Sequence, residues 1–153
     1  MMNFNDAELQ NNLDLIPANT IAKARLVLKP GNDFLDPFIT RSKTGETAYL
    51  NCEFIILEGP YAKRKIFDKI GFEGPDRWIN MGKARIRAIL ESAKGIHPND
   101  ISETAVAARK IESFSELNNL DVMIKIGIEH DKSGMYQDKN RVVSIVTPDK
   151  YVA

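Results

Sequence analysis

Cysteine is nearly absent from this 153-residue chain, which contains only Cys52. A single thiol forms no internal disulfide, and disulfide frameworks are typical of small secreted domains. Apolar residues alternate around Cys52, so we expect it to be buried as a small hydrophobic side chain. The amino terminus, MMNFNDAELQNNLDLIP, lacks the basic segment and the apolar core of a secretory signal. Both features predict a protein of the reducing cytoplasm.

Long apolar runs and an excess charge of one sign are also missing. No apolar run approaches the roughly 20 residues that a membrane-spanning helix needs, so we expect no membrane partner. The 21 basic residues balance the 21 acidic residues, so nucleic-acid binding would require local segregation of charge. With 43% hydrophobic and 27% charged residues, the chain has the composition of one globular domain.

Motifs of catalysis and of cofactor binding are missing as well. The two histidines, His97 and His130, have no metal-ligand spacing to each other or to the cysteine. No phosphate-binding loop of the Walker type is present, and Gly71, Gly74 and Gly82 do not match the dinucleotide fingerprint. The sequence therefore predicts a protein that is not an enzyme and that has no metal and no cofactor.

A hairpin of two strands is predicted between Ala48 and Phe72. Apolar and polar residues alternate in both strands, as expected for half-buried strands, and Glu58-Gly59-Pro60 allows the reversal between them. When the strands pair, the alternation places the following residues on the outward face: Tyr49, Asn51, Lys65, Phe67 and Lys69. Aromatic side chains among lysines are suited to single-stranded DNA, because aromatic rings stack on bases and lysines contact phosphates.

The rest of the chain predicts three further strands and a helical region. Apolar alternation indicates strands over 20–29, 120–129 and 141–147. A helix is predicted over 76–94, capped by Asp76 and ended by Gly95. Two shorter helical segments are expected from capping-box spacings that begin at Asp100 and Ser113.

The predicted order is therefore three strands, a helix and two more strands. This is the order of the OB-fold, a five-stranded Greek-key barrel. The predicted fold class is therefore mainly β with a helical cap, the helix region lying between the third and fourth strands. We assign residues 19–148 to this domain. Residues 1–18 are expected to form a loosely docked amino-terminal arm, and residues 149–153 a carboxyl-terminal tail.

Two long loops are expected to flank the binding face of such a barrel. OB-folds bind oligonucleotides on strands two and three and in the loops that join strands 1–2 and 4–5. Those loops correspond here to residues 30–47 and 130–140, and both contain aromatic and basic residues. The residues that we predict to bind DNA from these loops and from the hairpin turn are Arg41, Lys43, Lys63, Arg64, Lys132, Tyr136 and Lys139.

Six short motifs between residues 20 and 147 indicate a family resemblance. They are Arg41-Ser42-Lys43-Thr44-Gly45, Tyr49-Leu50-Asn51, Glu58-Gly59-Pro60-Tyr61, Arg64-Lys65-Ile66-Phe67-Asp68, Ala84-Arg85 and Asp138-Lys139-Asn140-Arg141-Val142. In order and spacing they resemble a phage and prophage family of small proteins, formerly of unknown function. Its members are regarded as single-stranded DNA-binding proteins and are encoded near recombination and replication genes.

The resemblance implies an OB-like fold and binding without catalysis in the cytoplasm of a bacterial host. It implies single-stranded DNA as the ligand and recombination or replication proteins as partners, and it leaves self-association open. The chain departs from the family at Lys63, where relatives often have glycine. It also lacks an acidic carboxyl-terminal tail of the bacterial single-strand-binding type.

Each of these interpretations has a structural alternative. Tyr49 and Phe67 would pack beneath the arm or a partner subunit if the barrel were a protein-interaction or assembly module. Trp78 is expected at the start of the helix as a core residue. A charged stripe on the same helix is expected to be solvated, and it comprises Lys83, Arg87, Glu91 and Lys94.

Overall fold

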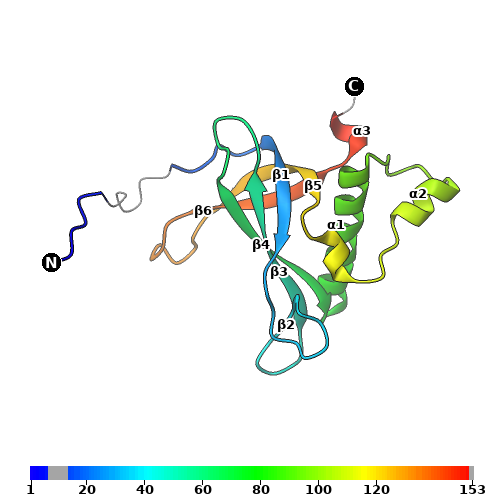
Figure 1. The fold of residues 1–153 in the computed structure, drawn as a ribbon, viewed down its shortest axis with the longest axis horizontal. Helices are drawn as coiled ribbons and strands as arrows, with labels where there is room; N and C mark the ends of the chain where they lie inside the picture. Colours follow the sequence, from blue (N-terminus) through cyan, green and yellow to red (C-terminus); the bar gives the residue numbers. More distant parts are fainter. Residues whose placement is uncertain (7–13, 152–153) are drawn as a thin grey trace.

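The observed elements follow the predicted order, with one additional short strand. The computed structural model describes residues 1–6 and 14–151. Its strands are β1 (Thr20–Leu28), β2 (Ile39–Arg41), β3 (Ala48–Ile56), β4 (Lys65–Glu73), β5 (Asp121–Glu129) and β6 (Lys139–Val146). Its helical elements are α1 (Asp76–Lys94), α2 (Glu103–Ala108), the 3-10 turn η1 (Phe114–Leu117) and α3 (Pro148–Tyr151), as Figure 1 shows.

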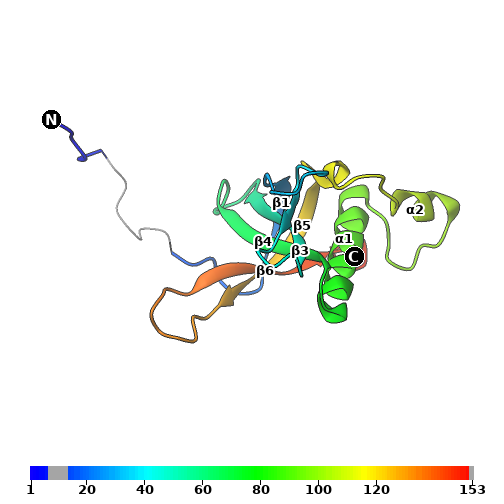
Figure 2. The same ribbon diagram turned by 90° about the horizontal axis from the view of Figure 1, so that it is seen from below.

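All six strands belong to one antiparallel sheet. β3 pairs with β4 on one side and with β1 and the short β2 on the other, while β5 lies between β1 and β6. β4 and β6 are the end strands, and no ladder joins them in the described part of the chain. The mainly β class with helices is therefore confirmed, but the sheet is not closed into a hydrogen-bonded barrel (Figures 1 and 2).

The inward face of the sheet is packed with the apolar residues that alternate along each strand. Fully buried side chains come from β1, β3, β4 and β5, among them Leu26, Leu50, Cys52, Phe54, Ile70, Ile124 and Ile126. α1 covers this core with Ile89 and Leu90, which are also buried. The predicted strand faces are thus confirmed, because a period of two in the sequence matches the alternation of side chains in a strand.

Two glycines allow α1 to approach β4 closely. Gly82 of α1 lies against Gly71 of β4, and a Cβ atom on Gly82 would be only 1.7 Å from the Gly71 carbonyl oxygen. A Cβ on Gly71 would in turn be 2.0 Å from the Trp78 ring. Any larger residue at these positions would push the helix away from the strand.

The helix ends agree only in part with the capping predictions. Gly95 has the expected left-handed conformation, with φ of 68°, and Ser113 and Glu116 form the predicted capping box. Asp76 lies in the first turn of α1 and is not its cap, and Ser102 caps α2 where the sequence predicts Asp100. Within the described residues, no helix has the length and hydropathy that a membrane crossing requires.

The amino-terminal arm is docked more firmly than the sequence predicts. Ile16 is only 1% exposed and belongs to the hydrophobic core. Its backbone N–H donates to the Asn140 side chain at 2.9 Å, and its carbonyl oxygen accepts from the same amide at 2.9 Å. The packed unit therefore begins a few residues before the expected boundary at residue 19, while residues 7–13 of the arm lie outside the described part.

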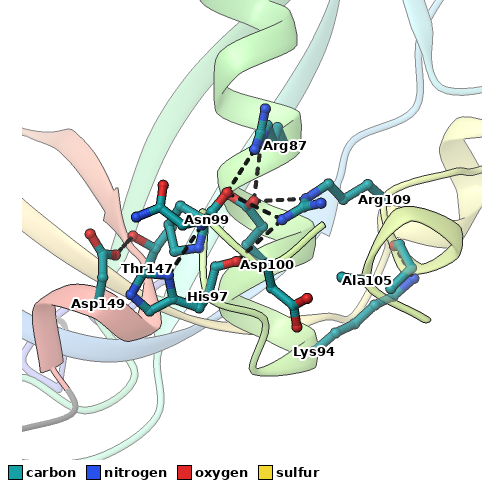
Figure 3. Close-up of polar contacts among 12 residues, drawn as sticks. Arg87, Lys94, His97, Asn99, Asp100, Ala105, Arg109, Thr147 and Asp149 are labelled. Atoms are coloured by element: carbon teal, nitrogen blue, oxygen red, sulfur yellow. Dashed lines mark hydrogen bonds and ion pairs between the residues drawn. The ribbon is translucent and has the colours of Figure 1, made fainter. Parts of the chain in front are cut away.

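The charged stripe of α1 is not wholly solvated, and the expectation for Glu91 was wrong. Glu91 is 3% exposed and accepts hydrogen bonds from Arg87 Nε at 3.1 Å and from Arg109 Nε at 2.8 Å. Arg109 also donates to the carbonyl oxygen of His97, and Lys94 donates to a carbonyl at the end of α2 (Figure 3). These contacts join the 96–118 segment to α1. The prediction for Glu91 was wrong because its partner Arg109 lies outside the helix, and the spacing of residues within α1 does not reveal such a partner.

Candidate nucleic-acid interface

The β3–β4 pairing brings five of the predicted DNA-binding residues onto one outward face. In the register of this pairing, four pairs of residues lie directly opposite each other: Tyr49–Gly71, Asn51–Lys69, Glu53–Phe67 and Ile55–Lys65. Because paired residues point to the same side of a sheet, the residues gathered outside the core are Tyr49, Asn51, Lys65, Phe67 and Lys69. Phe67 is 63% exposed although it is a large apolar side chain.

At one end of this face, Tyr49 meets the first turn of α1. The Trp78 ring lies edge-on to Tyr49, with ring centroids 6.5 Å apart, and Lys69 Nζ lies 4.9 Å from the Tyr49 centroid. Both rings line a hollow of about 370 Å³, together with Thr47, Lys69 and Pro75. Trp78 is half-buried, so it combines the expected packing role with a place at the surface hollow.

The middle of the face borders the gap between β4 and β6. A hollow of about 440 Å³ lies there, and its lining includes Asn51, Phe67, Lys69, Lys139 and Arg141. Lys139 and Arg141 come from β6, which is far from β4 in the sequence but adjacent to it across the unpaired side of the sheet.

Arg85 of α1 bridges the two end strands in place of a backbone ladder. Its Nη2 donates to the Val142 carbonyl oxygen of β6 at 3.3 Å, and its Nε lies 3.7 Å from an Asp68 carboxylate oxygen of β4. Burial raises the pKa of Asp68, and the charge of Arg85 opposes this rise. The guanidinium therefore compensates a half-buried carboxylate and also holds the edges of the gap together.

The β5–β6 loop adds a third hollow, of about 540 Å³, whose lining includes Lys132, Tyr136 and Lys139. Asp131 fixes the shape of this loop by accepting from the Tyr136 backbone N–H at 2.7 Å and from Ser133 Oγ at 2.8 Å. The hydrogen bond from Tyr136 lowers the pKa of Asp131, so the carboxylate stays charged. The Tyr136 side chain is left 76% exposed.

The three hollows adjoin one another, because neighbouring ones share lining residues. Lys69 lines both the first and the second hollow, and Lys139 lines both the second and the third. We call this surface the aromatic–cationic path, and in order it comprises Trp78, Tyr49, Lys69, Phe67, Arg141, Lys139, Lys132 and Tyr136. Four aromatic rings and four cations are interspersed along it, over the first turn of α1, β3, β4, β6 and the β5–β6 loop.

Acidic side chains also lie beside the path. Glu53 is 5% exposed although it faces outward, and its carboxylate is 3.3 Å from Lys29 Nζ and 3.8 Å from Lys65 Nζ. Lys139 Nζ lies 3.6 Å from a Glu129 oxygen. The charges of Lys65 and Lys139 are therefore partly neutralised. Lys69, Lys132 and Arg141, in contrast, have no ion pair among the described residues.

The remaining predicted residues do not join the path. Arg41 is bound to Glu73 at 2.7 Å and to Asp33 at 2.6 Å, and these hydrogen bonds raise the pKa of its guanidinium. It therefore connects β2 to β4. Lys43 is exposed in the turn after β2, and the loops around β2 extend in a different direction from the β5–β6 loop in Figure 1.

The hairpin turn holds Lys63 in a backbone conformation that is typical of glycine. Lys63 has φ of 74°, a left-handed conformation that favours glycine. Its N–H donates to the Ile56 carbonyl oxygen, and the Ile56 N–H donates to the Arg64 carbonyl oxygen, so two residues oppose one in a bulge. Arg64 Nη2 donates to the Asp14 carbonyl oxygen at 2.8 Å, so this side chain holds the arm.

Trp78, expected as a core residue, and Arg141 are the path residues that sequence reasoning did not select as DNA-binding, and Arg141 could have been found. The signal was present, because Lys139 and Arg141 are separated by two positions and so share a face of β6. The predicted strand began only at residue 141, so the alternation with Lys139 was not recognised.

Chemically, the path offers stacking surfaces and cations rather than reactive groups. In the described part of the chain no three His, Cys, Asp or Glu side chains are arranged to hold a metal ion. The chain matches no protein-family model, and the comparison with curated proteins finds no match either. The resemblance to the phage family is therefore still a prediction from the quoted motifs.

Proposed function

We propose that the protein binds single-stranded DNA along the aromatic–cationic path, without catalysis and with little sequence preference. The observation on which this rests is the exposure of Phe67 between Lys65 and Lys69, on the same face as Tyr49. An exposed ring flanked by cations is suited to a ligand that combines flat bases with phosphates. Stacking contributes about 1–3 kcal/mol per base and depends little on base identity.

The neutral net charge is compatible with this function because several acids are engaged away from the path. Asp33 and Glu73 neutralise Arg41, Asp121 pairs with Arg25 at 2.8 Å, and Glu91 is enclosed by two arginines. Lys69, Lys132 and Arg141 lie on the path and have no ion pair within the part of the chain that the structure describes, so their charges are available to phosphates.

The strand arrangement also supports an OB-like fold for this binding. When β2 is set aside, β1, β3 and β4 followed by α1, β5 and β6 have the order of the OB-fold, and the path crosses the second and third of these strands. In this proposal the barrel is open between β4 and β6. The motif resemblance adds a role in phage-type replication or recombination in a bacterial cytoplasm.

The test is fluorescence anisotropy of a labelled oligo-dT of about 30 nucleotides, with a duplex of equal length for comparison. We expect tight binding to the single strand and much weaker binding to the duplex. Phe67→Ala should weaken binding about tenfold, which is the lower part of the stacking range. Phe34→Ala is the matched control, because Phe34 is 100% exposed in the loop before β2 and lies off the path.

Absence of binding to oligo-dT at low salt would refute the proposed function. Equal affinities of Phe67→Ala and Phe34→Ala would show that binding does not use the path. The thermal unfolding midpoint of each variant is measured alongside, so that a loss of affinity is separated from a loss of folded protein.

A protein-interaction module is the second candidate function, and an apolar hollow elsewhere favours it. Ile21, 53% exposed, lines a hollow of about 480 Å³ with Pro60, Tyr61 and Met123. If this function applies, an Ile21→Ala and Tyr61→Ala double variant changes the oligomeric state seen by sedimentation, and the unmodified protein does not bind oligo-dT.

A further inference from the structure

The arm reaches the sheet at the start of β6, next to the path. Ile16 is buried there, and the Asn140 amide both accepts from its N–H and donates to its carbonyl oxygen. One residue before Leu15, the Asp14 carbonyl oxygen accepts from Arg64. The backbone on both sides of Leu15 is therefore held in place (Figures 1 and 2 show where the arm meets β6).

Leu15 itself is not part of the core. It is 41% exposed, whereas Ile16 next to it is 1% exposed. Leu15 and Phe67 line one hollow of about 340 Å³, a volume suited to a small planar ligand. Two partly exposed apolar side chains thus share this cavity at the surface.

Cations surround this hollow. Its lining also includes Arg64, Lys65, Lys139 and Arg141, against a single acid, Glu129. A hollow with apolar side chains and several cations in its lining suits a ligand that has a flat uncharged part and a phosphate on each side. A nucleotide within a strand has this chemistry, and bases are held elsewhere between aromatic and apolar side chains.

We propose that Leu15 and Phe67 form a slot for one base of the bound strand, with Lys65 and Arg141 placed for its flanking phosphates. This inference rests on the proposed function and extends it to a residue of the arm. The slot is the place where the arm becomes part of the binding surface, so the anchored segment 14–16 serves both packing and ligand binding.

The test compares Leu15→Ala with Ile101→Ala, since Ile101 is an aliphatic residue 83% exposed on the segment between α1 and α2. We expect Leu15→Ala to weaken oligo-dT binding about five- to tenfold, because one wall of the slot is lost. Ile101→Ala should bind like the unmodified protein. The thermal unfolding midpoint should change little in either variant.

A second variant gives a direct signal from the slot. In Leu15→Trp the new indole should stack on the base, so oligo-dT should quench its fluorescence beyond the quenching that Trp78 alone shows in the unmodified protein. This readout stays valid if Leu15→Ala proves less stable.

The outcomes separate the two proposals. If the unmodified protein binds and Phe67→Ala weakens binding, but Leu15→Ala is unchanged and Leu15→Trp shows no added quenching, the slot is refuted and the proposed function stands. If the unmodified protein does not bind oligo-dT, both are refuted.

Discussion

The salt dependence of oligo-dT binding follows from the number of cations that line the path and the slot. Arg64 borders the slot and Arg85 borders the second hollow of the path, but Arg64 holds the Asp14 carbonyl oxygen and Arg85 holds the Asp68 carboxylate. The cations left for phosphates are Lys65, Lys69, Lys132, Lys139 and Arg141. We test them by neutralising Lys69, whose charge is not shared with an acid in the described residues.

Each phosphate neutralised on a single strand contributes about −0.7 to the slope of log affinity against log salt. Five cations give a slope of about −3.5, and the three that are free of acids give about −2. The steeper value weakens binding about a hundredfold when salt rises fourfold. Lys69→Gln should reduce the magnitude of the slope by about 0.7.

The assay is fluorescence anisotropy of labelled oligo-dT at four or more salt concentrations. Lys110→Gln is the control, because Lys110 is exposed after α2 and lies off the path, so its slope should equal that of the unmodified protein. The reasoning is refuted if Lys69→Gln leaves the slope unchanged, or if the unmodified protein has a slope of less than about one cation's contribution.

Three further predictions concern stability. Lys63→Gly should raise the free energy of unfolding by about 0.5–1 kcal/mol, because glycine adopts the left-handed conformation without strain; urea unfolding checks this, and a decrease would contradict it. Glu91→Ala should lower that free energy by about 1–3 kcal/mol, because the half-buried Arg109 loses its carboxylate partner and keeps only its carbonyl contacts, and the oligo-dT affinity should stay unchanged. Burial raises the pKa of the Cys52 thiol, so the folded protein should resist Ellman's reagent. The contribution of Cys52 to the stability should be constant below the unfolded thiol pKa of about 8.5 and should fall above it.

Local patterns were sufficient to predict the part of the path that lies on the hairpin. Tyr49, Phe67 and Lys69 of the path share a face with Asn51 and Lys65 because side chains alternate along a strand, and the register follows from the apolar pattern of the two strands. Chain order likewise indicated the succession of strands around α1. These features depend on residues close to one another in the sequence.

Contacts between distant segments could not be predicted in the same way. Arg41 carries the charge expected of a phosphate ligand, but Glu73 lies 32 residues later and reaches it only once β2 and β4 flank β3. In the sequence Ile16 belongs to a polar arm, and its partner Asn140 lies 124 residues further along the chain. In both cases the partner is determined by the assembled sheet and not by spacing in the sequence.

The unpaired β4–β6 side of the sheet has a mechanical consequence. The strand pairs β3–β4 and β5–β6 are joined through the backbone ladders of β1 alone. Arg85 links their free edges, since it contacts Asp68 on β4 and Val142 on β6. Phe67 and Lys139 lie on these two edges. We therefore expect the space between them to depend on Arg85, although its contacts are with the protein and it is not itself a path residue.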